Sequence, residues 1–466
     1  AFMVAEKVEV ESLSYQDGAK ATKWSCTGDT DYEFSTSDKK EIGTTVRLYI
    51  NEENKDFLQS YKIREVIAQY CDFMPYSITL IDLKENKRIE EENAKATKEE
   101  DKKPIPVDII NETKPLWKKD PTTITDDEYK TFFRKLFPYE QEPLFWLHLN
   151  VDHPFTLQGI LYFPKLNPTK PINENSIRLY SKQVFVSDNV KSIVPEFLGL
   201  LKGAIDSSDI PLNVSRSALQ GDPNVKKISN YIIKKVAESL KKLFKNDRAR
   251  YETVWEDIAL FVKYAIVSDT KFDELMREFV LFKNSEAKLV TVQEYQDSIP
   301  AAYKEKLKDK IITFEKNSSD ESLRKQLLQE GIQVVEIDNY IDPHFTQHTE
   351  FKKQGDKAIK FVAIDAEVEN LLSSEDNSSE NNQIKEIFNS VFGIKAESDK
   401  EEDKGGNKLL GVEVRNIKNS TAAAYLKQDH AMKRFKQMTQ SMGQTAFDAP
   451  LKRTLVINPE NALIKN

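Results

Sequence analysis

The chain has 466 residues, of which 39% are hydrophobic and 31% are charged, with 76 acidic against 68 basic side chains. This length favours two to four domains, and the apolar fraction supports several hydrophobic cores, which excludes wholesale disorder. The sequence shows no run of about 18 apolar residues that would predict a transmembrane helix, and no signal-peptide pattern at its first residues. The acidic balance is atypical of a general nucleic-acid binder.

The first 83 residues predict β-structure followed by a helix. Alternating residues from 6 to 50 predict an antiparallel meander of three or four strands. Apolar residues at helical spacing from 57 to 70 predict a helix that covers one face of this sheet, and 78–83 predicts another strand. The only cysteines, Cys26 and Cys71, suggest neither a disulfide framework nor a zinc site, so we expect a reducing, cytoplasmic compartment.

Residues 84–103 differ in character from the sequence on either side. Fourteen of these twenty residues are charged, seven of each sign, and none is aromatic. Such a segment cannot form a core, so we predict a solvated linker or a long hairpin tip. Its balanced charge argues against an arm that binds nucleic acid or a membrane.

Residues 104–372 predict a larger α/β unit up to 246, a helical stretch over 247–283 and a smaller βαβ unit over 284–372. In the larger unit we predict a short helix over 195–203 and a polar loop from residue 205. The segments expected to be regular in these units are helices 126–137, 224–244, 247–280 and 320–329, and strands 145–151, 156–163, 176–180, 183–186, 310–314 and 332–337.

A domain boundary is predicted near residue 372, where the composition changes. Stretches rich in Ser, Asn and acidic residues, 372–383 and 396–407, bracket an apolar helix over 384–391. The chain begins inside an apolar run at Ala1 and ends just after a strand-like run, 451–457, which is typical of a fragment of a longer protein.

The sequence carries none of the common phosphate-loop, dinucleotide-binding or metalloprotease motifs, and no serine stands in a nucleophile elbow. His344 and His348 have the spacing of a metal pair on a helix. Pro343 precedes them and no third ligand is apparent, so we predict no metal site.

The most unusual segment runs from residue 205 to 220. Its residues Asn213, Arg216 and Gln220 are three and four apart, so on a helix they would project together. An arginine on such a loop can stabilise the charge of a transferring phosphoryl group. The alternative is that Arg216 pairs with Asp206 or Asp209 and only fastens the loop.

Three other features have both a functional and a structural interpretation. Gly43 and Thr44 could face a ligand at the start of a strand, or could simply shape a turn. Trp117 could be an exposed contact residue for another chain, or could fill a local core. Near the C-terminus, an apolar stripe at helical spacing could bind varied partners or pack in a core; its residues are Tyr425, Met432, Phe435, Met438 and Met442.

Taken together, six stretches resemble the HtpG chaperones, the bacterial branch of the heat-shock protein 90 family, and in detail its Bacteroidetes members. The longest and most specific is Gly203-Ala-Ile-Asp-Ser-Ser-Asp-Ile-Pro-Leu-Asn-Val-Ser-Arg216. The others are residues 1–8, 42–44, 110–117, 159–164 and 179–186.

This resemblance implies three domains in an α/β and α+β multidomain fold. Residues 1–83 would be the C-terminal part of an ATP-binding domain, a two-layer α/β sandwich, and 84–103 a charged linker. Residues 104–372 would be an α/β middle domain with a helical coil, and 373–466 part of an α+β dimerisation domain. The helix that carries the catalytic glutamate and the magnesium-binding asparagine would lie outside this chain.

The resemblance also implies roles for individual residues. Arg216 would reach the γ-phosphate of ATP, supported by Asn213 and Gln220, while Gly43 and Thr44 would belong to the nucleotide pocket. Trp117 and the methionines Met432, Met438 and Met442 would bind clients.

We therefore expect a cytoplasmic, stress-related molecular chaperone that needs ATP and Mg²⁺ and forms a homodimer when complete. Its partners would be unfolded clients and other chaperones, with no nucleic acid and no membrane. We expect that this chain alone would not hydrolyse ATP and would be mainly monomeric. The alternative interpretation is a non-enzymatic scaffold that binds protein partners and does not bind a nucleotide.

Overall fold

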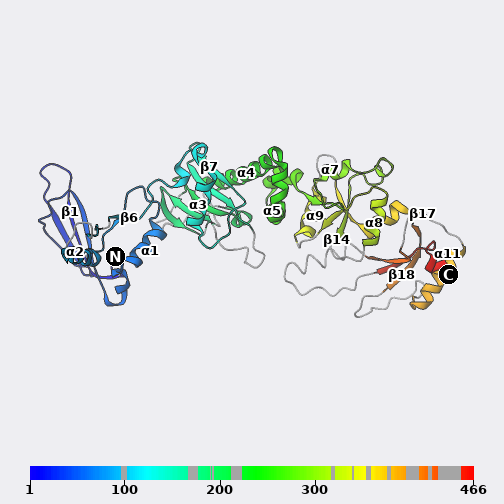
Figure 1. Ribbon diagram of the computed structural model, residues 1–466, viewed down its shortest axis with the longest axis horizontal. Coiled ribbons are helices and arrows are strands. Elements are labelled where there is room, and N and C mark those ends of the chain that lie inside the picture. Colours follow the sequence, from blue (N-terminus) through cyan, green and yellow to red (C-terminus); the bar gives the residue numbers. More distant parts are fainter. Residues whose placement is uncertain are drawn as a thin grey trace.

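The elements of the chain follow one another along the longest axis of the computed structural model, from a small N-terminal sheet to a C-terminal sheet (Figure 1). Sheets and helices both contribute, so the predicted mixed α/β class is confirmed. The structure describes residues 1–95, 102–105, 107–165, 177–188, 190, 194–210, 223–315, 321–337, 341–352, 358–374, 379–394, 409–417, 422–428 and 453–465.

The N-terminal sheet has four antiparallel strands in the order β3-β2-β1-β4. The predicted β-structure is confirmed, but the strands do not form a simple meander, because β4 pairs with β1 and not with β3. The strands are β1 (Ala5–Leu13), β2 (Thr22–Cys26), β3 (Tyr32–Thr36) and β4 (Gly43–Ile50).

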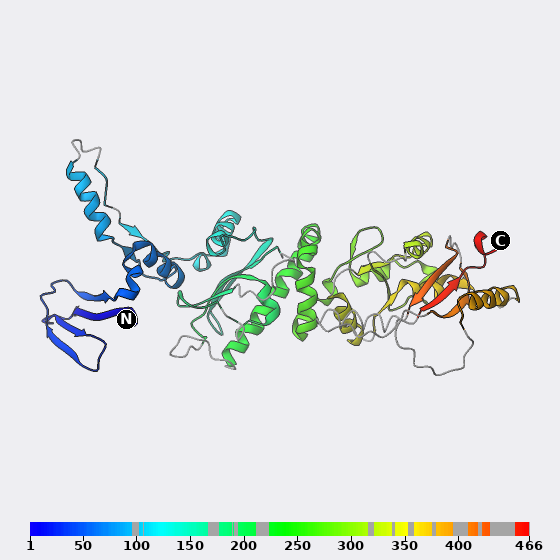
Figure 2. The ribbon, with the colours of Figure 1, turned by 90° about the horizontal axis from the view of Figure 1, so that it is seen from below.

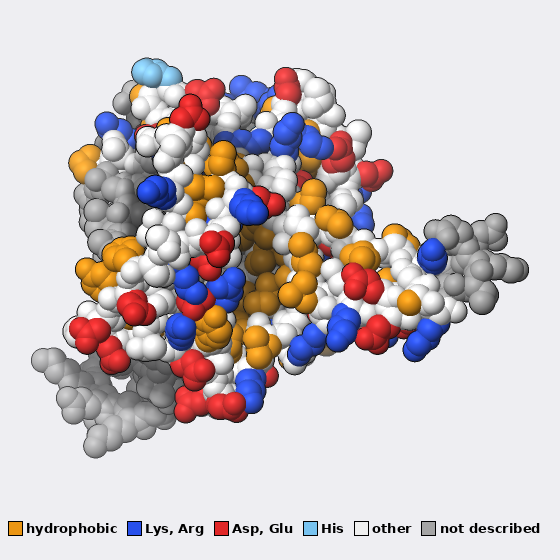
Figure 3. Space-filling view, turned by 90° about the vertical axis from the view of Figure 1, so that its left-hand side faces the viewer, with side chains coloured by type: hydrophobic (Ala, Val, Ile, Leu, Met, Phe, Trp, Pro, Cys, Tyr) orange, Lys and Arg blue, Asp and Glu red, His pale blue; other side chains and the backbone are white. Residues whose placement is uncertain are grey.

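This sheet has one apolar and one charged face, because side chains alternate along each strand. On the apolar face Val10 lies between Trp24 and Val46. Much of this face is open to solvent, since Phe34 is 67% exposed and Val46 is 59% exposed. Figure 3 looks at this end of the molecule and shows hydrophobic side chains at the surface.

The prediction that a helix over 57–70 covers the sheet is wrong. That region forms a 3-10 helix, η1 (Glu52–Leu58), and then α1 (Ser60–Tyr70). Helix α1 packs against η1 and against strand β10 (Val184–Ser187) of the next unit, where the rings of Tyr70 and Phe185 lie 5.9 Å apart. Helix α1 therefore packs through aromatic contacts against the next unit and not against the sheet.

The charged face is centred on Glu9, which is only 4% exposed. Its carboxylate accepts hydrogen bonds from Arg47 and Tyr49, and Lys7 and Lys23 lie 2.9 and 3.1 Å away. These contacts lower the pKa of Glu9 to about 2, and the hydrogen bond from Lys7 contributes most. Desolvation of the buried carboxylate acts in the opposite direction.

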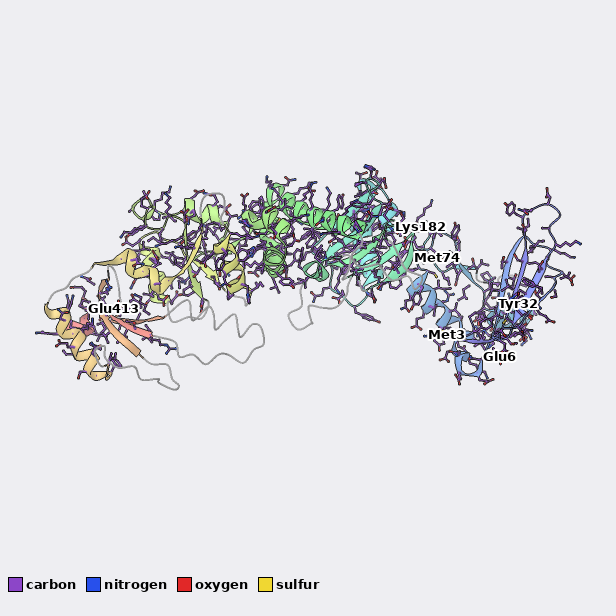
Figure 4. The ribbon with its side chains drawn as sticks, turned by 180° about the vertical axis from the view of Figure 1, so that it is seen from behind. Met3, Glu6, Tyr32, Met74, Lys182 and Glu413 are labelled. Atoms are coloured by element: carbon purple, nitrogen blue, oxygen red, sulfur yellow. The ribbon has the colours of Figure 1, made fainter. Side chains whose placement is uncertain are left out.

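We predict that Glu9→Gln lowers the stability of the sheet at neutral pH. The folded pKa lies below the ordinary value of 4.5, so this stabilisation is complete above about pH 4.5 and is lost as the pH falls towards 2. Urea unfolding of both proteins from pH 7 to pH 2.5 should therefore show a difference that shrinks on acidification. Glu6→Gln is the control, because Glu6 lies exposed on the same strand and has no ion pair among the described residues (Figure 4). A difference that does not change with pH would contradict the prediction.

The segment predicted as a linker over 84–103 is not wholly irregular. It begins with helix α2 (Leu83–Lys95), which projects away from the sheet in Figure 2 and buries Ile89. The strand predicted over 78–83 is shorter, because only β5 (Thr79–Leu80) forms, paired with β6 (Asp108–Ile109). The charges were correctly predicted to be solvated, but regular charge spacing is also compatible with an exposed helix.

The larger unit contains a five-stranded sheet in the order β10-β9-β11-β8-β7. The predicted helix over 126–137 is confirmed as α3 (Asp126–Leu136), which Thr125 caps in a capping box with Glu128. The remaining elements are β7 (Phe145–Val151), β8 (Leu157–Phe163), β9 (Ile177–Ser181), β11 (Lys202–Asp206), η3 (Leu116–Lys118), η4 (Pro121–Thr123) and η5 (Glu196–Leu200).

Strand β11 was not predicted. The sequence indicated a helix over 195–203 and a loop from residue 205, but the helix ends at Leu200 and β11 follows. This strand lies in the middle of the sheet, parallel to β9 and antiparallel to β8. Gly203 permits the close approach, because a Cβ there would lie 2.0 Å from the carbonyl oxygen of Ile160.

A helical region and a smaller parallel sheet follow, as predicted. The small sheet has the order β15-β14-β16, and Gly331 ends helix α8 with φ +75°. The elements are α4 (Pro223–Asn246), α5 (Arg248–Ser268), α6 (Thr270–Met276), η6 (Arg277–Phe279), β12 (Phe282–Lys283), β13 (Leu289–Val290), α7 (Val292–Asp297), η7 (Ala301–Tyr303), β14 (Lys310–Glu315), α8 (Glu321–Gln329), β15 (Val335–Ile337), α9 (Asp342–Phe351), β16 (Lys360–Ala363) and α10 (Ile364–Leu372).

The C-terminal region contains a three-stranded sheet in the order β18-β21-β20. Tyr425 lies in strand β20, so the prediction that it begins a helical stripe is wrong. The elements are β17 (Ser373–Ser374), α11 (Ser379–Val391), β18 (Leu409–Val414), β19 (Asn416–Ile417), β20 (Ala424–Gln428), β21 (Arg453–Ile457) and α13 (Ala462–Lys465). No helix within the described ranges is both long and apolar enough to cross a membrane.

Candidate functional site

Strand β11 brings Asp206 to the point where the unusual segment begins. The carboxylate is 4% exposed and accepts a hydrogen bond of 3.1 Å from the backbone N–H of Gln183. Burial raises the pKa of Asp206, and the charge of Lys118 and the nearby N–H groups of Gln183 and Trp117 only partly oppose this. Sequence reasoning placed Asp206 in a solvated loop, whereas the strand pairing buries it.

The next residues are fastened to the start of β8. The hydroxyl of Ser207 donates to the carbonyl oxygen of Thr156 at 2.6 Å, and the backbone N–H of Thr156 donates to Asp209 at 2.5 Å. The backbone N–H of Asp209 in turn donates to the hydroxyl of Ser207. Residues 206–210 thus form a fixed base for the segment that follows.

These contacts bear on the alternative in which Arg216 only fastens the loop. Asp206 and Asp209 each accept a hydrogen bond from a backbone N–H, that of Gln183 in the turn between β9 and β10 and that of Thr156 just before β8, so neither carboxylate depends on an arginine for a partner. The predicted catalytic residues Asn213, Arg216 and Gln220 lie in 211–222, outside the described residues. Their roles therefore stay predictions.

The predicted nucleotide contacts Gly43 and Thr44 lie at the start of β4, an edge strand. Gly43 has φ +128°, and no atom lies within 4 Å of the position that a Cβ would take. The hydroxyls of Thr44 and Ser12 are 2.9 Å apart. The pair offers a hydroxyl group and an accessible backbone, but its surroundings do not enclose a nucleotide. Gly43, Thr44 and their described neighbours therefore do not by themselves form an ATP site.

The prediction that Trp117 forms an exposed apolar patch is wrong. Trp117 is 0% exposed in a cluster of aromatic side chains, with its ring centre 4.8 Å from that of Phe73, 5.7 Å from Phe132 and 5.1 Å from Tyr180. Its indole N–H lies near Asp206 but completes no hydrogen bond. The structural interpretation is correct, because residues distant in sequence supply the surrounding aromatic rings.

The methionines predicted to bind clients, Met432, Met438 and Met442, lie within 429–450, outside the described residues. Their role stays a prediction. Sequence reasoning did not single out the exposed apolar residues of α11, where Ile387 is 59% and Val391 is 73% exposed. Their spacing of four on a predicted helix was the available signal.

His344 and His348 lie four apart on helix α9, as the spacing suggested. His348 Nε2 is 3.2 Å from Asp273, a buried carboxylate that also bonds Arg277 and Lys352 at 2.9 Å. Burial raises the pKa of Asp273, but the hydrogen bonds from these cations outweigh it and leave the pKa lowered. This cluster fastens α9 to α6, and no group of three metal-ligating side chains is found among the described residues.

A cleft of about 1140 Å³ lies between the helical region and the smaller sheet. Its lining mixes apolar side chains such as Phe244 and Phe279 with acidic and basic ones. The two basic side chains in its wall, Arg277 and Lys352, both bond Asp273. None of the predicted site residues that the structure describes lines this cleft.

Comparison with known proteins identifies the family. A family model described as Hsp90 protein matches residues 82–466. The chain belongs to the Hsp90 protein family. Over its whole length it is 38% identical to the Chaperone protein HtpG of Bacteroides thetaiotaomicron, and 37% identical to those of Bacteroides fragilis and Porphyromonas gingivalis.

The chain spans 66% of the length of each of these three relatives. Residues 1–81 precede the region matched by the family model, so the assignment of the N-terminal sheet rests on the full-length relatives. The predicted resemblance to bacterial HtpG proteins, including Bacteroidetes members, is thereby confirmed.

Proposed function

We propose that this chain is the larger part of an ATP-dependent molecular chaperone that binds and remodels unfolded or partly folded proteins. The observation that carries the proposal is the match of the whole chain to proteins named Chaperone protein HtpG. The complete protein would bind ATP with Mg²⁺, form a homodimer and work in the cytoplasm. The proposed parts are an ATP-domain portion (1–83), the charged segment (84–103), a middle domain (104–372) and part of a dimerisation domain (373–466).

The described geometry supports a positioning role for residues 206–210. Their contacts with Thr156 and Gln183 hold the residues that directly precede the segment carrying Arg216. We propose that Arg216 reaches the nucleotide phosphates when the ATP-binding and middle domains approach, and that Asn213 and Gln220 support it. A fixed loop base would reduce the entropy lost when the arginine takes its place.

The test compares a complete protein that includes this chain with the chain itself. We expect the complete protein to hydrolyse ATP and to suppress the aggregation of a thermally unfolded enzyme in a nucleotide-dependent manner. The chain alone should hold unfolded protein without hydrolysis. Suppression of aggregation by the complete protein with no ATP turnover would favour the non-enzymatic scaffold instead.

Methionines are suited to binding many sequences, because their side chains are flexible and polarisable. We predict that either substitution alone, Met432→Ser or Met438→Ser, weakens the binding of an unfolded client about ten- to hundredfold, since one buried side chain contributes at most about 1.5–3 kcal/mol, and that the double variant weakens it further. Fluorescence anisotropy with a labelled unfolded client measures the change. Met3→Ser is the matched control, because Met3 is 91% exposed in the N-terminal unit (Figure 4). Equal binding by the folded double variant would contradict the assignment, which also includes Met442.

A further inference from the structure

We propose that Gln183 is a positioning residue that couples the junction after the N-terminal unit to residues 206–210, which directly precede the segment carrying Arg216. Gln183 lies in the tight turn between β9 and β10, where both Lys182 and Gln183 have positive φ values, 51° and 66°. Figure 4 labels Lys182 and Met74, sequence neighbours of Gln183 and Phe73, at this junction. The link to catalysis rests on the proposed function, whereas the coupling itself does not.

The side chain of Gln183 joins two points that are distant in sequence. Its Nε2 donates to the carbonyl oxygen of Phe73 at 2.8 Å and to that of Thr113 at 3.0 Å. The amide of Gln183 thus ties together the two ends of residues 74–112, which include α2, next to the backbone hydrogen bond of 2.7 Å from Glu112 to Asp72. Phe73 and Thr113 can therefore keep their relative positions even when the conformation of residues 74–112 changes.

The same residue also contacts the loop base. The backbone N–H of Gln183 donates to Asp206 at 3.1 Å, directly before the Ser207 and Asp209 contacts with Thr156. Asp206 is buried, so loss of this donor would leave a carboxylate poorly solvated. A shift of the turn that contains Gln183 would thus change the hydrogen bonds of both the junction and residues 206–210.

The N-terminal side of the junction is well packed. Phe73 is 0% exposed and lies against Trp117 and Tyr180, although the sequence assigned it to the N-terminal unit. Lys135 makes a second bridge, with ion pairs of 3.2 Å to Asp72 and 3.1 Å to Glu112. Lys135 has no described contact with Asp206, so the two bridges can be separated experimentally.

The amide of Gln183 suits its surroundings. Two carbonyl oxygens face the side chain, and the amide nitrogen supplies one N–H donor to each. In Gln183→Glu the carboxylate has nearly the same shape but cannot donate when ionised, and it would face both carbonyl oxygens. The turn should then shift while the rest of the unit keeps its fold.

Hydrogen exchange followed by mass spectrometry tests the coupling on this chain without nucleotide or client. We expect Gln183→Glu to speed amide exchange about tenfold in peptides covering both 70–76 and 204–210. Lys135→Met should speed it only in 70–76. Unchanged exchange in β14 (Lys310–Glu315) and an unchanged circular dichroism spectrum verify the fold. Faster exchange on one side only, or on neither, would overturn the proposal.

A complete protein that includes this chain provides the catalytic readout. Gln183→Glu should lower kcat for ATP about tenfold and leave KM unchanged, because it misplaces the loop base and does not touch the nucleotide. An unchanged kcat would overturn the positioning role. If the wild-type complete protein hydrolyses no ATP, the proposed function fails, whereas the exchange result still decides whether Gln183 couples the two regions.

Discussion

Arg216→Ala, in a complete protein that includes this chain, should lower ATP turnover about 100-fold and leave nucleotide affinity largely unchanged. The reason is that Arg216 follows β11 in the sequence and is far from the N-terminal sheet along the chain. It would contact the nucleotide only when the two domains approach, so it contributes to the transition state more than to the bound ground state. Single-turnover hydrolysis and equilibrium titration with a fluorescent nucleotide separate these two quantities.

Two further variants sharpen this test. Arg216→Lys keeps the charge but loses the planar guanidinium group, so it should restore only part of the activity. Arg134→Ala is the matched control, because Arg134 lies exposed in the same unit and pairs with Glu142 at 3.3 Å. Wild-type turnover in Arg216→Ala would show that the arginine only fastens its loop.

Trp117→Ala should destabilise the larger α/β unit by about 3–5 kcal/mol, the range typical of large aromatic residues replaced by alanine in a core. Trp117 is 0% exposed and touches Phe73, Phe132 and Tyr180, so the substitution leaves a cavity among rings that cannot fully close it. Urea unfolding followed by circular dichroism measures the loss.

Trp117→Phe provides the comparison. It keeps most of the apolar area and removes the indole N–H, which completes no hydrogen bond, so it should cost much less than alanine. If Trp117→Ala unfolds at the same urea concentration as the wild type, the burial described here does not stabilise the protein. Weaker client binding in this variant would have to be interpreted together with its stability.

Much of the local structure was predictable because its causes are local. Thr125 and Glu128 form a capping box wherever such a pair precedes an amphipathic run, so the start of α3 followed from four residues. Gly331 ended α8 for a similar reason. The charged composition predicted exposure correctly for the described charged residues of 84–95, but it could not distinguish a linker from the exposed helix α2.

Two features were not predictable, because residues far apart in sequence decide them. Strand β11 has only five residues and includes Gly203, and it forms because β8 and β9 pair with it on both sides. Helix α1 had an apolar stripe that could have covered the sheet, but contacts with β10 draw it to the next unit. The composition of a segment reports that it will be buried, but not against which partner.

Residue identity and order along the chain were enough to predict the family and the mixed α/β class, and to single out the segment that contains Asn213, Arg216 and Gln220. The packing of the folded chain was needed to show that Trp117 is a core residue and that Asp206 is buried at a strand end. It also placed Gln183 within hydrogen-bonding distance of Phe73, Thr113 and Asp206. Burial and hydrogen bonding depend on which groups meet in space, and those groups are separated here by up to 110 residues of chain.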